Sequence, residues 1–165
     1  MRHRIFIAIN LPEEIKNQLL SYQAKWPELP IRWTKKENLH ITLEFLGYLS
    51  DDELLKVCQN TKELAAEKKS FTLTLDKICY GPPKKMPPRM VWVVGEKIGA
   101  FNFSPHITLG RIRTWQWRQI EPEERPEVSE EINLNFEVSS IEVMESVLKK
   151  GGPEYTALES CPLKS

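Results

Sequence analysis

The residues of this sequence best suited to chemistry lie in a repeated tetrapeptide, His-Ile-Thr-Leu, that begins at His40 and again at His106. The chain has three histidines, and two of them belong to this repeat. Both copies lie in apolar, β-branched segments that favour strands, so each histidine shares one face of its strand with a threonine, Thr42 or Thr108. Each copy therefore presents an imidazole beside a hydroxyl group on a rigid element.

Two imidazoles that face each other across a groove could carry out acid–base catalysis. Their reference pKa is about 6.5, so near neutral pH one ring can accept a proton while the other donates one. Each such transfer accelerates a reaction by roughly 10²–10⁴-fold. The threonine hydroxyl groups can donate hydrogen bonds to the non-bridging oxygens of a phosphate. The repeat therefore predicts phosphodiester cleavage without a metal or other cofactor, with His40 and His106 as the catalytic residues.

Two other interpretations of the repeat are weaker. A metal site would need further ligands at suitable spacing, but His3 lies outside the repeat and Glu44 is the only acid expected near His40 on its face of the strand. A purely structural repeat would retain the apolar positions, with no reason to retain histidine and threonine on the outward face. The functional interpretation is therefore favoured.

The elements expected to position these residues are mostly strands. Alternating or continuous apolar runs predict strands at 4–10, 31–34, 40–46, 71–79, 90–94, 106–112, 132–138 with a continuation over 141–147, and 155–163. Helices are expected over 12–26 and from a cap at Ser50 or Asp51 to about residue 67. Four prolines make 81–88 a loop, and the polar stretch 113–130 is expected to be a long loop. The fold class is therefore α+β with largely antiparallel pairing.

Length and composition set limits on the function. With 165 residues, 41% hydrophobic and 28% charged, the chain is expected to form a single globular domain of two lobes over residues 1–165. Lys+Arg and Asp+Glu both number 23, which argues against a protein that wraps long nucleic acid by charge alone. A nucleic acid would instead be held locally, at one end or one phosphate.

Cysteine usage and hydropathy bear on the compartment. The three cysteines, Cys58, Cys79 and Cys161, form no CxxC pair, so we expect reduced thiols in a cytoplasmic protein. No apolar stretch approaches the roughly 18 residues of a membrane span, so no membrane association is expected.

With these motifs and their flanks, the sequence resembles the two-histidine phosphoesterase superfamily, and within it the LigT-like RNA 2′,3′-cyclic phosphodiesterases, also called RNA 2′-5′ ligases. The resemblance covers most of the chain. It rests on five blocks in order: RIFIAINLPEE, IRWTKKENLHITLEFLG, RMVWVVG, FSPHITLGRI and GPEYTALESCPL.

The resemblance implies a bilobal fold in which two pseudo-symmetric, mostly antiparallel sheets flank a central cleft, with the helices outside. It implies that His40 is the general acid for the 3′-oxygen leaving group and that His106 is the general base that activates water. Thr42 and Thr108 would hold the phosphate. Arg111 would help to bind it, although strict alternation from His106 puts Arg111 on the opposite face unless Gly110 hosts a bulge. Tyr155 would border the cleft or else pack in the core.

The implied enzyme is an RNA 2′,3′-cyclic 3′-phosphodiesterase that opens the cyclic phosphate to a 2′-phosphate and, in some members, reversibly joins RNA through a 2′-5′ linkage. Its partner would be RNA with a 2′,3′-cyclic phosphate end or a small cyclic nucleotide, and we expect a monomer. Two alternatives stay open. One is a related substrate, such as ADP-ribose 1″,2″-cyclic phosphate or a 2′-5′ oligonucleotide. The other is a non-catalytic protein that binds RNA ends.

The sequence departs from the family pattern at one point. Family members usually have a helix before the second motif, but here only residues 95–104 separate the expected strand 90–94 from the motif. Either the helix is lost or the sequence lacks a segment.

Two further groups of residues have two interpretations each. Lys84, Lys85 and Arg89 in the proline-rich loop could contact RNA phosphates or simply be solvated. The segment 113–118, with its two tryptophans and two arginines, could stack on bases or cover the core. Phe45 is expected to face the core, because alternation from His40 places it there.

Overall fold

The protein folds into two antiparallel sheets. The computed structural model describes residues 1–165, with the exception of the side chain of Ala100. The strands are β1 (Arg2–Asn10), β2 (Ile31–Trp33), β3 (His40–Ser50), β4 (Phe71–Gly81), β5 (Met90–Gly95), β6 (His106–Ile112), β7 (Ser129–Val138), β8 (Ser140–Lys149) and β9 (Gly152–Pro162). The helices are α1 (Glu13–Gln23), α2 (Asp51–Glu67) and α3 (Thr114–Gln119), with short 3₁₀ turns η1 (Lys36–Asn38), η2 (Gly99–Phe101) and η3 (Pro122–Glu124).

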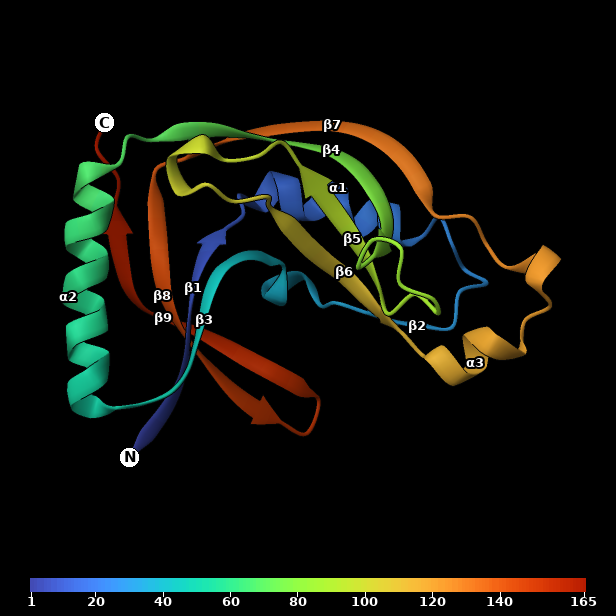
Figure 1. Ribbon diagram of the computed structural model, residues 1–165, viewed down its shortest axis with the longest axis horizontal. Coiled ribbons are helices and arrows are strands. Elements are labelled where there is room, and N and C mark those ends of the chain that lie inside the picture. Colours follow the sequence, from blue (N-terminus) through green and yellow to red (C-terminus); the bar gives the residue numbers. More distant parts are fainter.

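Each copy of the repeat opens a strand of a different sheet. One sheet has four strands in the order β3-β1-β8-β9, and the other has five in the order β2-β6-β5-β4-β7. All the pairings between these strands are antiparallel. In Figure 1 the four-stranded sheet lies beside α2, and the five-stranded sheet extends toward α3 at the other end of the molecule. The α+β class and the two-sheet arrangement expected from the sequence are confirmed.

The core joins the two sheets. Alternate residues of the strands point inward and form one buried cluster, which includes Ile41 beside His40 and Ile107 beside His106. Helix α1 buries Ile15 and Leu19 in the same cluster. Ile41, Ile107 and Leu109 of the repeats are therefore fully buried and Leu43 is partly buried, while the histidines and threonines are only partly covered.

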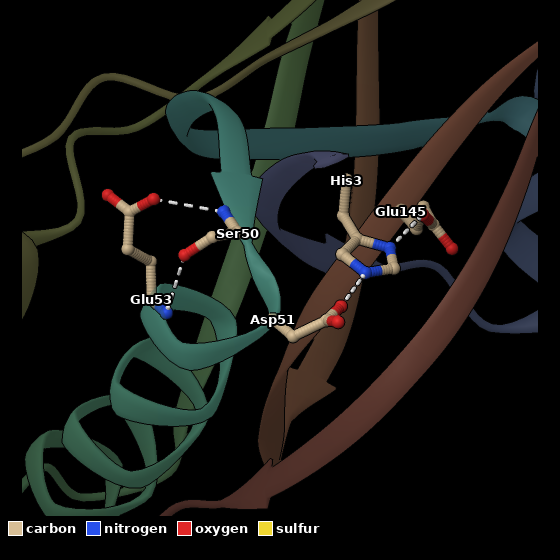
Figure 2. Close-up of polar contacts among 5 residues, drawn as sticks. All are labelled: His3, Ser50, Asp51, Glu53 and Glu145. Atoms are coloured by element: carbon tan, nitrogen blue, oxygen red, sulfur yellow. Dashed lines mark hydrogen bonds and ion pairs between the residues drawn. The ribbon is translucent and has the colours of Figure 1, made fainter. Parts of the chain in front are cut away.

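Helix α2 begins at the predicted cap. The Ser50 hydroxyl accepts a hydrogen bond from the Glu53 backbone N–H at 3.2 Å, and the Glu53 carboxylate accepts one from the Ser50 N–H at 2.9 Å (Figure 2). This reciprocal capping box satisfies two backbone N–H groups at the helix end. Beside it, the ring of His3 bridges Asp51 at 2.6 Å and Glu145 at 2.7 Å, and so joins β1 to α2 and β8 (Figure 2).

Two expectations about local structure were wrong. The segment 113–130 contains α3 and η3, and β7 already begins at Ser129. Trp117 anchors this segment because its side chain is buried in the core under the guanidinium of Arg125, 4.2 Å from the ring centroid. In addition, β8 does not continue β7, because the chain passes at Ser139 from the five-stranded to the four-stranded sheet.

The short connection before the second motif contains the 3₁₀ turn η2 and no α-helix among the described residues. It covers the core with Ile98, which is buried, and with Phe101 and Phe103, which pack against the core cluster. The β5–β6 pairing is present from Val94–His106 to Met90–Arg111. The second motif therefore keeps its place in the sheet without that helix.

No helix in the described part of the chain is both long and apolar enough to cross a membrane.

Candidate active site

A cleft of about 480 Å³ lies where β3 and β6 meet. Residues from both sheets and from the β8–β9 hairpin line it. All six side chains singled out from the sequence are among them: His40, Thr42, His106, Thr108, Arg111 and Tyr155. The structure thus brings both copies of the repeat to one cavity.

Hydrogen bonds from Thr34, in the segment before β3, to β6 hold the two copies of the repeat close to each other. Thr34 donates from its hydroxyl to the Thr108 carbonyl at 2.8 Å and from its backbone N–H to the Leu109 carbonyl at 2.8 Å. The Gln23 amide of α1 then donates to the carbonyls of Thr34 and Leu109 at 3.0 and 3.2 Å. Because Thr34 lies only six residues before His40, these contacts tie one motif to the other.

The ring of His40 is held at both nitrogens. Nδ1 lies 2.7 Å from the backbone carbonyl of Asn38, and a carbonyl oxygen only accepts, so Nδ1 carries the proton. In the neutral ring, Nε2 is then unprotonated and accepts a hydrogen bond from the Thr42 hydroxyl at 2.8 Å. Burial lowers the pKa of His40 below its ordinary value, while the bond to Asn38 opposes this effect and a charge on His106 adds to it.

His106 is held by an aromatic contact instead. Its ring stacks on the indole of Trp92, with ring centroids 4.0 Å apart and planes 19° from parallel. Burial alone lowers the pKa of His106, and no backbone carbonyl offsets this effect as it does at His40. The two imidazoles are thus chemically distinct, although their tetrapeptides are identical.

Arg111 reaches the cleft because of a bulge. Val91 pairs with Gly110 and Trp92 pairs with Thr108, so Leu109 is an extra residue in β6. The extra residue reverses the alternation and puts Arg111 on the same face as Thr108. The bulge is therefore present, one residue before the Gly110 at which it was expected, and a side chain at that glycine would meet Ile31 at 2.6 Å.

A second bulge explains a residue that sequence reasoning misplaced. Ala8 pairs with Thr42 and Ile7 pairs with Glu44, so Leu43 is the extra residue in β3. Phe45 therefore turns to the cleft, where it is 68% exposed, and does not face the core. Bulges of this kind depend on the partner strand, so the single sequence carried no signal for this one.

The cleft also contains cations that the sequence did not single out. Arg32 and Arg111 are directly paired across β2 and β6, and Lys35 lies close by. Two like charges on paired strand positions repel each other unless an anion lies between them. Among the described residues neither arginine has a carboxylate partner within 4.0 Å, and Glu44 is the one acid that lines the cleft. The cleft is thus electropositive in a chain of zero net charge.

Tyr155 borders the cleft and does not enter the main core. Its ring meets His40 edge-on, with centroids 5.1 Å apart and planes at 85°. It also packs on Phe6 at 5.2 Å, and burial raises the pKa of its hydroxyl group. Tyr155 therefore helps to fix the His40 ring from the side of β9.

No group of three His, Cys, Asp or Glu side chains in the described part of the chain is arranged to hold a metal ion. The three cysteines are unpaired thiols, and burial raises the pKa of Cys161 to about 11.

This cleft lies between two antiparallel sheets that each contribute one His-x-Thr strand, and both motif histidines and both motif threonines line it. The family described as LigT like Phosphoesterase matches residues 9–92, which is half of the chain. A protein of Escherichia coli named RNA 2′,3′-cyclic phosphodiesterase is 33% identical over 66% of this chain and 71% of its own. One of the same name from Methanocaldococcus jannaschii is 28% identical over 94% of this chain and 98% of its own.

Solved structures agree with these matches. A Thermus thermophilus protein superposes with a TM-score of 0.83 at 26% identity and covers 98% of both chains. Escherichia coli LigT, solved with NADP⁺, gives a TM-score of 0.75 at 27% identity over the whole of both chains. This chain belongs to the LigT-like phosphoesterase family.

Proposed function

We propose that this protein hydrolyses the 2′,3′-cyclic phosphate at RNA ends to a 2′-phosphate, by acid–base catalysis from His40 and His106 and without a metal. The observation that carries the proposal is that the two motif histidines line one electropositive cleft together with both motif threonines. Relatives named RNA 2′,3′-cyclic phosphodiesterase support this substrate class. Escherichia coli LigT has also been solved with phosphate and with 3′-AMP.

The surroundings of the two rings favour His40 as the acid. The Asn38 carbonyl accepts from Nδ1 and stabilises an imidazolium, so Nε2 can carry the proton that is donated. Burial lowers the pKa of both rings, but only at His40 does a carbonyl oppose this effect, so His106 is the ring favoured as the neutral base. This division of roles agrees with the one implied by the family resemblance.

The reaction then follows from these roles. His106 takes a proton from water as the water oxygen bonds to phosphorus, and the bond from phosphorus to the 3′-oxygen breaks. His40 delivers its proton to that oxygen, which leaves a 3′-hydroxyl and a 2′-phosphate. Thr42, Thr108 and Arg111 stabilise the charge on the non-bridging oxygens. If the 5′-hydroxyl group of a second RNA takes the place of water, His106 would accept its proton, the bond from phosphorus to the 3′-oxygen would break with a proton from His40, and the two RNAs would be joined through a 2′-5′ linkage.

The test is hydrolysis of 2′,3′-cyclic AMP in the presence of EDTA, with the products separated by chromatography. We expect 2′-AMP as the product, and loss of turnover by at least about 10²-fold in His40→Asn and in His106→Asn. Formation of 3′-AMP would show that the 2′-oxygen, and not the 3′-oxygen, is the leaving group. Inhibition by EDTA, or full activity of either variant, would refute the mechanism. A panel that includes ADP-ribose 1″,2″-cyclic phosphate and a 2′-5′ oligonucleotide distinguishes the alternative substrates. Binding of the cyclic end without turnover would identify the non-catalytic alternative.

The monomeric state and the cytoplasmic location remain predictions from the sequence.

A further inference from the structure

We propose that the substrate is held beyond the cleft as a single strand of RNA, on a surface that we call the basic end. Its residues are Lys84, Lys85 and Arg89 of the loop before β5, and Arg113 and Trp115 after β6. This inference rests on the proposed function, because it assumes that the cleft holds the 3′ end of the strand. It predicts that an RNA strand is a better substrate than a cyclic mononucleotide.

The first observation is a concentration of positive charge in a neutral chain. Residues 82–118 contain seven lysines and arginines and one acid, Glu96, a net charge of 7 − 1 = +6. The remainder of the chain has 23 − 7 = 16 basic and 23 − 1 = 22 acidic residues, a net charge of −6. The zero total thus conceals a positive segment that contains the second motif.

The second observation is that the fold gathers this charge, apart from Glu96 and Lys97 in the β5–β6 connection, at one end of the five-stranded sheet. Met90 pairs with Arg111, and the Ile112 N–H donates to the Arg89 carbonyl at 2.8 Å. The loop that enters β5 and helix α3 that follows β6 therefore leave the sheet at the same end. Figure 1 shows both on the side of the molecule opposite α2.

The side chains of the basic end are available to a ligand. Lys84, Lys85, Arg89 and Arg113 are exposed, and in the described structure none has a carboxylate partner within 4.0 Å. Other exposed cations, such as Lys62 with Glu159, do form ion pairs. Exposed cations without a carboxylate partner are suited to the phosphates of a nucleic acid.

Trp115 makes this surface suitable for a single strand. Its side chain is 61% exposed, whereas Trp117, two residues later, is buried in the core. An exposed indole beside free cations offers a face on which an unpaired base can stack. A duplex would hide its bases from such a contact, so the combination favours single-stranded RNA.

The basic end continues the candidate active site. Along β6, His106, Thr108 and Arg111 follow one another on the cleft, and Arg113 comes next beyond the strand. A cyclic phosphate occupies both hydroxyl oxygens of the terminal ribose, so the strand can continue only from its 5′ side. The strand would then leave the cleft past Arg111 and cross the basic end.

The test compares two substrates and two triple variants. The substrates are 2′,3′-cyclic AMP and an unstructured RNA of about ten nucleotides that ends in a 2′,3′-cyclic phosphate. The test variant is Lys85→Gln, Arg89→Gln, Arg113→Gln. The matched control removes three exposed lysines from the α2 side of the molecule, Lys56→Gln, Lys69→Gln, Lys164→Gln. Neither variant touches a residue of the cleft.

We expect the test variant to keep the kcat/KM for cyclic AMP and to lose on the order of 10-fold for the RNA at low salt, while the control keeps both. In a plot of the logarithm of RNA affinity against the logarithm of salt concentration, the slope for the test variant should be shallower than that of the wild type by about 2. Each lost contact to a single strand removes about 0.7, and the variant loses three. Trp115→Ala should weaken RNA binding by roughly 10-fold without affecting cyclic AMP.

If the test variant loses as much kcat/KM for cyclic AMP as for RNA, or if the control variant loses as much as the test variant, the proposal that RNA binds the basic end is refuted. An unchanged RNA activity in the test variant would also refute it. If the wild type cleaves neither substrate, the proposed function fails, and fluorescence anisotropy with a labelled RNA that ends in a 2′-phosphate still tests the surface. Wild-type binding that is lost in the test variant would then support the basic end, and equal binding by both would refute it. Equal binding of duplex RNA would refute the single-strand assignment.

Discussion

Substituting Gly81 by alanine should impair catalysis through Trp92. The indole of Trp92 lies on β5, between Gly81 on β4 and His106 on β6. A Cβ atom at Gly81 would lie 2.3 Å from Cδ2 of that indole, whereas ordinary van der Waals contact begins at 3.4 Å. The ring must therefore move by about 3.4 − 2.3 = 1.1 Å, and His106 is stacked against it at 4.0 Å.

The size of the effect follows from this displacement. A shift of about 1 Å in a catalytic group costs on the order of 10²-fold in rate, so we expect kcat to fall by 10- to 100-fold. Overpacking should also lower the free energy of unfolding by about 1–3 kcal/mol. The assay is hydrolysis of 2′,3′-cyclic AMP at a temperature where thermal unfolding shows every variant to be folded.

Two controls separate position from stability. In Gly99→Ala the new Cβ meets nothing within 4 Å, so this variant should match the wild type. Ile78→Val removes a methylene group from the buried face of β4 and should cost about 1 kcal/mol of stability without loss of kcat. If Gly81→Ala loses stability but keeps its kcat, the stacked indole does not set the position of His106, and the reasoning fails.

Three more predictions concern pH and stability. Because the pKa values of His40 and His106 are both lowered, both limbs of the bell-shaped profile of kcat/KM for 2′,3′-cyclic AMP should lie on the acid side of 6.5; an alkaline limb above pH 7.5 would contradict this assignment. Hydrogen bonds to Asp51 and Glu145 raise the pKa of His3, so the stability lost in His3→Gln should be greatest below pH 6.5 and should shrink as the pH rises through that raised pKa, as thermal unfolding across pH would show. A difference that grows toward high pH would exclude the charged bridge. Finally, Ser50→Ala should lower the free energy of unfolding by about 1 kcal/mol in urea titration, because the Glu53 N–H loses its acceptor, and an unchanged midpoint would show that the capping box contributes nothing.

The strands and the two long helices were predictable because their signals are local. The alternation of apolar residues follows the pleat of a strand, and Ser50 three residues before Glu53 is a local cap signal. The six-residue helix α3 was missed because it is held by the burial of Trp117, which is a tertiary contact. The passage from β7 to β8 was misjudged because two strands separated only by Ser139 gave no sign that they belong to different sheets.

The two candidate catalytic groups could be named from the sequence, since only His40 and His106 repeat with a threonine on the same strand face. The sequence also determined that Ile41 and Ile107 are buried beneath them, because side chains alternate along any strand. The tertiary structure alone decided that the two motifs meet, through the hydrogen bonds of Thr34 to β6. It also decided that Arg111 and Phe45 face the cleft, because each bulge depends on the register of a partner strand. Finally, the tertiary structure gave the histidines of two identical tetrapeptides different surroundings, because His40 is hydrogen-bonded to the Asn38 carbonyl and His106 is stacked on the indole of Trp92.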